Sequence, residues 1–174
     1  MTPEPIQFPA QPRTRDYRLV LGLITALVVL FDRLSKLWID SHIQMGTYIT
    51  LIPGVFRLSH VLNTGAAFSL FADSLSPGTV RNALIAFSVI ACLIVVVMLW
   101  RTGRTLTLGS VAFAFILGGA IGNLYDRIRF AYVIDFLEVR IIHYHWPDFN
   151  VADSCIVVGA CLLLLEILRP QPTT

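Results

Sequence analysis

Two aspartates lie in or next to apolar runs, where a carboxylate is costly unless it is paired or has a functional role. Asp135 interrupts the apolar run Tyr-Val-Ile-Asp-Phe, where no neighbour in sequence would stabilise a buried charge. Asp153 follows Asn150 at the start of a long apolar run, where a helix dipole favours an acid and Asn is a good N-cap. Asp153 therefore has a purely structural alternative as a helix-start acid, whereas Asp135 must be paired if it is buried.

A pair of such carboxylates can activate water. Two close carboxylates cannot both ionise readily, so one of them keeps its proton. The ionised member can take a proton from water as the water attacks a carbonyl carbon, and the protonated member can donate to the developing oxyanion. This chemistry requires no metal, cofactor or nucleophilic serine, and we expect none. The residues alone leave Asp126 open as an alternative partner in the pair.

Other catalytic chemistries have weaker support in the sequence. Lys36 is the only lysine and directly follows Ser35, so the two side chains would point apart on a helix. His143 and His145 with Asp148 could bind a metal, but a further convincing ligand is missing. Nucleophile-elbow and phosphate-loop motifs are absent from the sequence.

Two interpretations without hydrolytic chemistry stay open. A proton-coupled transporter also uses intramembrane acids, but those acids should lie near the middle of the bilayer between inverted repeats. Here the acids gather toward one predicted membrane face, and the sequence shows no repeat. The other reading is a non-catalytic membrane scaffold, in which replacing the acids would have no effect on any reaction.

The composition identifies the class of protein that must position these acids. Hydrophobic residues make up 56% of the 174 residues and charged residues only 14%, against roughly 25% charged in an average soluble domain. A soluble protein of this size could not bury so much apolar surface in one core. We therefore predict an all-α polytopic membrane protein with four transmembrane helices and a small extracytoplasmic β-platform.

The same composition argues against two other kinds of protein. The net charge of +2, without a basic stripe interleaved with aromatics, indicates no nucleic-acid partner. The odd cysteine count argues against a disulfide framework, because Cys92, Cys155 and Cys161 all lie in apolar stretches.

We predict membrane spans at about residues 19–39, 82–100, 105–125 and 151–168. The two central runs carry no charge, and each can cross a bilayer core of ~30 Å at 1.5 Å per residue. The first and last spans reach this length only by including Asp32 and Asp153 respectively. The resulting organisation is a segment 1–18, a four-span domain 19–168 with outer segments 40–81 and 126–150, and a tail 169–174.

The charge distribution predicts which side each segment faces. Arg13, Arg15 and Arg18 precede the first span, which places both termini in the cytoplasm. No small-x-small cleavage site follows the first apolar run, so we expect a retained helix rather than a cleaved signal peptide. Most acids and all four histidines then lie at or beyond the outer membrane face. We expect the chemistry at that face.

The outer segments and the third span add structural expectations. Residues 48–52 and 55–62 look like short strands, separated by the turn signal Pro53-Gly54. The aromatic-rich segment 126–150 is either a belt at the headgroup level or the wall of a cleft there. Gly118 and Gly122 form a G-x-x-x-G motif that should bring the third span close to a neighbouring helix.

Five fragments in this order and spacing resemble the bacterial lipoprotein signal peptidase (signal peptidase II) family over about residues 19–168. The fragments are Asp32-Arg33-Leu34-Ser35-Lys36, Asn63-Thr64-Gly65-Ala66-Ala67-Phe68, Gly118-Gly119-Ala120-Ile121-Gly122-Asn123-Leu124-Tyr125-Asp126-Arg127, Val133-Ile134-Asp135-Phe136 and Phe149-Asn150-Val151-Ala152-Asp153-Ser154. At the position where the family pattern usually has Gln, this chain has Arg33.

The resemblance implies an intramembrane aspartic endopeptidase of the bacterial cytoplasmic (inner) membrane, with its active site at the extracytoplasmic face. It would remove signal peptides from prolipoproteins, cutting on the N-terminal side of a diacylglyceryl-modified cysteine. The expected partners are these substrates and membrane lipids, and we expect a monomer. The family's catalytic acids fall on Asp135 and Asp153 of this sequence.

The resemblance also implies supporting roles. Residues expected near the substrate or the aspartate pair are Asn63, Asn123, Arg127 and Asn150. Residues expected as structural polar contacts are Asp32, Lys36 and Asp126. Asp32 and Lys36 are four apart, so on a helix they should form an ion pair.

Overall fold

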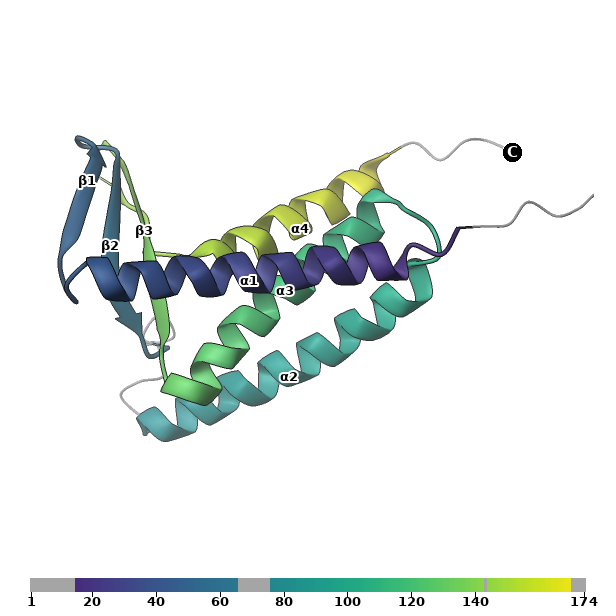
Figure 1. Cartoon of the computed structure of the whole chain (residues 1–174), viewed down its shortest axis with the longest axis horizontal. Helices are drawn as coiled ribbons and strands as arrows, with labels where there is room; N and C mark the ends of the chain where they lie inside the picture. The colour runs from purple at the N-terminus through teal and green to yellow at the C-terminus, as the bar shows by residue number, and fades with distance from the viewer. Residues whose placement is uncertain (1–14, 66–75, 143, 170–174) are drawn as a thin grey trace, which may run out of the picture.

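The structure, a computed structural model, describes residues 15–65, 76–142 and 144–169. In these ranges four helices run alongside one another, and a small sheet covers one end of them (Figure 1). The helices are α1 Arg18–His42, α2 Pro77–Thr102, α3 Leu108–Phe130 and α4 Val151–Leu168. The strands are β1 Tyr48–Ile52, β2 Phe56–Asn63, β3 Val133–Ile141 and β4 Tyr144–His145.

Three of the described helices are long and apolar enough to cross a membrane: α2 over Gly78–Thr102, α3 and α4. The sequence predicted four spans. The helix that is not apolar enough to count as a span by composition is α1. At 25 residues α1 has the necessary length, but its second half carries Asp32, Arg33, Lys36 and Asp40. Asp32 and Lys36 are nonetheless buried against the other helices.

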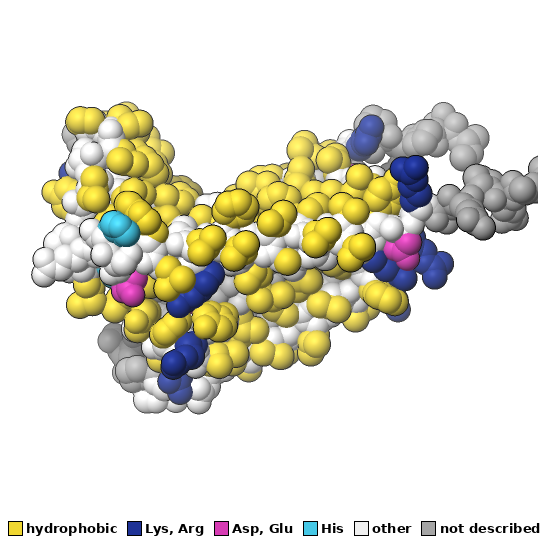
Figure 2. Space-filling view, viewed as in Figure 1, with side chains coloured by type: hydrophobic (Ala, Val, Ile, Leu, Met, Phe, Trp, Pro, Cys, Tyr) yellow, Lys and Arg dark blue, Asp and Glu magenta, His cyan; other side chains and the backbone are white. Residues whose placement is uncertain are grey.

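The outer surface of the helices suits a lipid environment. Large apolar side chains are exposed along all four helices, for example Leu23 and Phe31 on α1 and Ile90 and Leu93 on α2. Figure 2 shows apolar side chains covering most of the visible face of the helices. Polar backbone groups on these helices are satisfied within each helix, as a bilayer requires.

Helix α3 is the central helix and contacts α1, α2 and α4. Its glycines allow close approach on two sides. A Cβ added at Gly118 would lie 2.6 Å from Val28 Cβ, and one at Gly122 would lie 2.5 Å from Asp32 Oδ2, both on α1. Gly119, on another side of α3, faces the carbonyl oxygen of Ala152 on α4. The G-x-x-x-G motif therefore packs α3 against α1.

The sheet is antiparallel, with strand order β1-β2-β3-β4. The predicted strands 48–52 and 55–62 correspond to β1 and β2, so the expected β-platform is present. β3 was not predicted, because the first four residues of this strand are all buried and show no apolar–polar alternation. Ile134 and Phe136 of β3 pack against Ile39 and Ile43 at the end of α1, and this contact fixes the sheet on the helices.

Some sequence expectations lie outside the described residues. They concern Arg13, residues 66–68 of the second motif fragment and His143.

Candidate active site

Strand pairing places Asp135 beside Asn63. In the antiparallel pair of β2 and β3, Asp135 lies opposite Val61, so Asn63, two residues further along, is its diagonal neighbour on the same face. Asn63 Nδ2 donates to Asp135 Oδ2 at 2.9 Å. The backbone N–H of Gly65 donates to Asn63 Oδ1 at 2.8 Å, which fixes the orientation of this amide.

Asn150 joins the second aspartate to the first. Phe149 pairs with Leu137 of β3, and this pairing brings the start of α4 to the strand. Asn150 is fully buried. Its Oδ1 accepts from the backbone N–H of Asp153 at 3.0 Å, and its Nδ2 donates to Asp135 Oδ1 at 2.7 Å. One side chain therefore caps α4 and holds the carboxylate of Asp135.

Asp153 is both a helix-start acid and a member of the site. Its Oδ2 accepts from the backbone N–H of Asn150 at 3.2 Å, which completes a capping box at the start of α4. Its Oδ1 accepts from Asn123 Nδ2 of α3 at 2.8 Å. The structural and the functional interpretations of Asp153 are thus compatible, because each uses a different carboxylate oxygen.

The surroundings of Asp135 favour its protonated form. Burial is the largest cause and, together with the nearby charge of Asp153, raises the pKa of Asp135 from its ordinary 3.8 to about 6. The amide donors of Asn63 and Asn150 act in the opposite direction, because they stabilise the carboxylate. The pair can therefore hold one proton at mildly acidic pH, up to about 6, which is the state that acid–base catalysis by two carboxyls requires.

A buried charged cluster lies next to the aspartate pair. We call Asp32, Lys36, Asn123 and Asp126 the Lys36 cluster. Lys36 is fully buried, and its Nζ lies 2.8 Å from Asp32 Oδ2, 2.7 Å from Asp126 Oδ2 and 3.0 Å from Asn123 Oδ1. The expected ion pair between Asp32 and Lys36 is present. The contact to Asn123 Oδ1 leaves the Nδ2 of that amide for Asp153.

The same cluster also holds the first turn of α4 and occupies Asp126. Asp32 Oδ1 accepts from the backbone N–H of Ala152 at 3.0 Å. Asp126 pairs with Lys36 and, at 3.5 Å, with Arg33, whereas Asp153 shares Asn150 with Asp135. The geometry thus favours Asp153 over Asp126 as the partner of Asp135. Sequence reasoning missed the contact between Lys36 and Asn123, because 87 residues separate them.

Arg127 provides positive charge at the site. Its Nη1 donates to the carbonyl oxygen of Asn123 at 3.4 Å. The guanidinium is close enough to Asp153, Asp135 and Asp126 to interact with the charge of each. Arg127 is therefore placed to offset the concentration of negative charge around the pair.

The structure adds a third described residue, Glu138, to the metal site that the sequence suggested at His145 and Asp148. Glu138 joins His145 and Asp148, and their ligand atoms lie within 4.8 Å of one another. Sequence reasoning missed Glu138. The signal that could have found it is its spacing of two residues from Arg140, which in a strand places both side chains on the same face. Arg140 Nε lies 2.8 Å and Arg57 Nη1 3.6 Å from Glu138 Oε1. These two guanidinium groups compete with any cation for that carboxylate.

Comparison with known proteins assigns the family. The family profile described as Signal peptidase (SPase) II matches residues 24–169. A protein of Solibacter usitatus named lipoprotein signal peptidase is 38% identical over 148 residues, which cover 85% of this chain and 90% of that protein. A protein of the same name from Pseudomonas fluorescens is 43% identical over 151 residues, covering 86% and 88%.

A solved structure described as a bacterial membrane enzyme has the same fold. It superposes with a TM-score of 0.80 at 26% sequence identity, covering 92% of this chain and all of that one. The matched residues 24–169 contain both aspartates, the Lys36 cluster and the described strands. The chain belongs to the signal peptidase II family of membrane peptidases.

Proposed function

We propose that this protein is an intramembrane aspartic endopeptidase that removes signal peptides from diacylglyceryl-modified prolipoproteins, cleaving N-terminal to the lipidated cysteine. The observation that supports the mechanism is that Asn150 donates to the Asp135 carboxylate and accepts from the backbone N–H of Asp153, so that it links the first aspartate to the residue that carries the second. The substrate class is supported by the similar proteins, which are named lipoprotein signal peptidases.

In the proposed reaction the two carboxyls have opposite roles. Ionised Asp153 takes a proton from a water molecule as the water oxygen bonds to the scissile carbonyl carbon. Protonated Asp135, whose raised pKa of about 6 favours this form, donates its proton to the carbonyl oxygen. Collapse of the tetrahedral intermediate breaks the C–N bond. Asp153 then returns its proton to the leaving amine, while Asp135 recovers its own from the oxygen.

The side-chain amides of three neighbouring asparagines orient the two carboxyl groups. Asn63 and Asn150 each donate to Asp135, one to each carboxylate oxygen. Asn123 donates to Asp153. Since every one of these amides has its oxygen committed to another donor, the carboxyls are oriented before a substrate arrives. Such preorganisation is what catalysis by fixed polar groups requires.

The proposed membrane arrangement makes α1 the fourth span. α1 lies alongside the three apolar helices and reaches the sheet at one end (Figure 1). We propose that residues 1–18 and 169–174 are cytoplasmic, that the sheet lies outside, and that residues 19–168 form one monomeric peptidase domain in the bacterial cytoplasmic membrane. A lipid-anchored substrate would then reach the aspartates by diffusion within the bilayer.

The test is cleavage by the purified full-length protein in lipid nanodiscs. The substrate is a prolipoprotein with a diacylglyceryl group on its cysteine, and the control is the same polypeptide without lipid. We expect a product whose N-terminus is the lipidated cysteine, identified by mass spectrometry, and no cleavage of the control. Equal cleavage of both substrates, or cleavage at another bond, would contradict the proposed specificity.

A further inference from the structure

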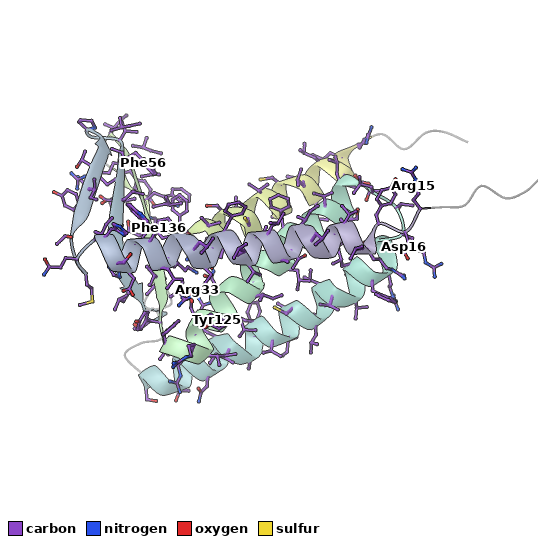
Figure 3. The ribbon with its side chains drawn as sticks, viewed as in Figure 1. Arg15, Asp16, Arg33, Phe56, Tyr125 and Phe136 are labelled. Carbon is purple, nitrogen blue, oxygen red and sulfur yellow. The ribbon has the colours of Figure 1, made fainter. Side chains whose placement is uncertain are left out.

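Arg33 is a partly exposed cation on the sheet-proximal half of α1. Figure 3 shows it projecting from α1 toward the end of α3, beside Tyr125. Its guanidinium carbon lies 5.3 Å from the ring centroid of Tyr125 and 4.9 Å from that of Phe130. The side chain is 28% exposed. Leu34 and Leu37 are exposed on the same helix, and Asp126 lies on the inner side of Arg33 at 3.5 Å.

The hydrogen-bonding capacity of Arg33 is largely unused by the described residues. A guanidinium has five N–H donors. Within the described part of the chain, its one side-chain hydrogen bond is to Asp126 Oδ1, at 3.5 Å. The other oxygen of Asp126 is engaged by Lys36 at 2.7 Å. Several N–H groups of Arg33 are therefore free to bind an acceptor from outside the protein.

A second guanidinium strengthens the positive character of this patch. The Arg129 guanidinium carbon lies 5.5 Å from the ring centroid of Phe130, and the side chain is exposed. Arg33 and Arg129 thus both contact the same ring. Both guanidinium groups lie within 5.5 Å of the Phe130 ring centroid, and a guanidinium binds a phosphate with paired hydrogen bonds.

Two cavities meet at Arg33. One, of about 110 Å³, is lined by Val29, Asp32, Arg33, Gly122 and Tyr125. The other, of about 50 Å³, is lined by Arg33, Lys36, Leu37, Asp40, Phe130, Tyr132 and Ile134. Along α1, the first cavity lies on the side away from the sheet and the second on the side toward it. Arg33 therefore separates a mainly apolar cavity among the helices from a more polar one near the sheet.

We propose that Arg33 and Arg129 bind the phosphate of an anionic phospholipid of the outer leaflet, with an acyl chain against the cavity lined by Val29 and Tyr125. A phospholipid matches this arrangement because its phosphate would meet the guanidinium groups and its acyl chain would meet the apolar cavity. The site uses neither aspartate of the catalytic pair. It rests on the proposed membrane placement, in which the sheet end faces outward, but not on the proposed peptidase reaction.

Native mass spectrometry of the full-length protein from detergent tests the site. The probes are dioleoyl-phosphatidylglycerol and dioleoyl-phosphatidylcholine, titrated separately. We expect one phosphatidylglycerol to bind about tenfold more tightly than phosphatidylcholine. Both lipids carry a phosphate, but the quaternary ammonium of phosphatidylcholine is repelled by the guanidinium groups, whereas the glycerol headgroup is neutral. Arg33→Gln should remove this preference, and Arg129→Gln should reduce it. Arg101→Gln, which removes an exposed charge at the opposite end of the bundle, is the matched control and should leave it unchanged.

Two further arms separate the alternatives. Glycerol phosphate carries the anionic group without acyl chains, and it should not displace the bound lipid at equal concentration. Val29→Phe, which fills the apolar cavity, should weaken binding of phosphatidylglycerol while Arg33 is intact, so the test does not depend on the folding of Arg33→Gln. Equal binding of the two lipids by the wild type, or equal losses in Arg101→Gln and Arg33→Gln, would overturn the proposal. Displacement by glycerol phosphate would show a phosphate site without lipid specificity and would also overturn it.

Discussion

At the scale of single residues, Asn150 links the carboxylate of Asp135 to the first turn of α4, which carries Asp153. It is fully buried, caps α4 and donates to Asp135. A buried amide that lost one of these partners would incur the cost of an unsatisfied polar group, about 1–3 kcal/mol. The position of Asp135 and the start of α4 are therefore coupled through one side chain.

The raised pKa of Asp135 predicts the pH dependence of the peptidase. If Asp135 carries the shared proton, kcat/KM should fall as pH rises through about 6. Asn63 stabilises the carboxylate, so Asn63→Leu should move this descending limb to higher pH. Leu62→Val, on the opposite face of the same strand, should leave the limb in place. A limb that does not move in Asn63→Leu would contradict the assignment of the proton to Asp135.

Lys36 is predicted to matter chiefly for stability. Lys36→Met leaves the buried carboxylate of Asp32 without its cation and leaves Asp126 only the 3.5 Å contact with Arg33, which should lower the free energy of unfolding by about 3–5 kcal/mol. The measurement is chemical unfolding in detergent micelles. Adding Asp126→Asn to Lys36→Met should restore part of the loss, because one uncompensated charge is removed. A Lys36→Met variant as stable as the wild type would contradict this account of the Lys36 cluster.

At the scale of elements, the crossing of α3 and α4 sets the position of Asp153. The two helices touch through glycine: Gly119 faces the carbonyl oxygen of Ala152, and a Cβ at Gly159 would lie 2.8 Å from the carbonyl oxygen of Ala112. A backbone carbonyl cannot move aside as a flexible side chain can. The distance between the helices is therefore fixed by the absence of side chains at these two positions.

Gly119→Ala should separate these helices and damage both stability and catalysis. We expect a loss of about 1–3 kcal/mol in the free energy of unfolding, typical of overpacking, together with a lower kcat because α4 carries Asp153. The matched control is Gly22→Ala on α1, where an added Cβ meets no atom within 4 Å. It should be neutral or slightly stabilising, since Ala is the better helix former. Equal effects of the two variants would argue against the close crossing.

Much of this element plan could be predicted from the sequence. Long uncharged runs predict α2 and α3, and a turn between alternating residues predicts β1 and β2. β3 could not be recognised, because Val133, Ile134, Asp135 and Phe136 are all buried and lack a strand period. The contacts of Asn150 with Asp135 and of Lys36 with Asn123 depend on tertiary packing, which no local pattern encodes. The resemblance, rather than any period or spacing, singled out Asp153 over Asp126.

At the scale of the whole molecule, the proposed topology depends on α1 crossing the membrane and on the sheet lying at its outer face. α1 is the helix whose charges keep it below the composition of a membrane span, yet two of them, Asp32 and Lys36, are buried against α3 and α4. Buried pairing of this kind lowers the cost of placing charge at membrane depth. The arrangement is therefore consistent with a fourth span whose polar residues face the inside of the bundle.

Cysteine labelling tests this topology. In a background without Cys92, Cys155 and Cys161, Ile142→Cys at the exposed end of β3 should react with a membrane-impermeant maleimide in intact spheroplasts. Asp16→Cys before α1 and Arg104→Cys between α2 and α3 should react only after permeabilisation. Labelling of Asp16→Cys from outside, with Arg104→Cys protected, would show that α1 does not cross the membrane.

The most direct test of the central claim is single-turnover cleavage of a diacylglyceryl prolipoprotein by the wild type, Asp135→Asn, Asp153→Asn and Asp126→Asn. We predict that Asp135→Asn and Asp153→Asn fold normally and lose at least about a thousandfold in rate, because each removes one half of the acid–base pair. Asp126→Asn should lose stability, and its folded fraction should still cleave. Near-normal cleavage by either pair variant, or a well-folded but inactive Asp126→Asn, would contradict the pairing of Asp135 with Asp153.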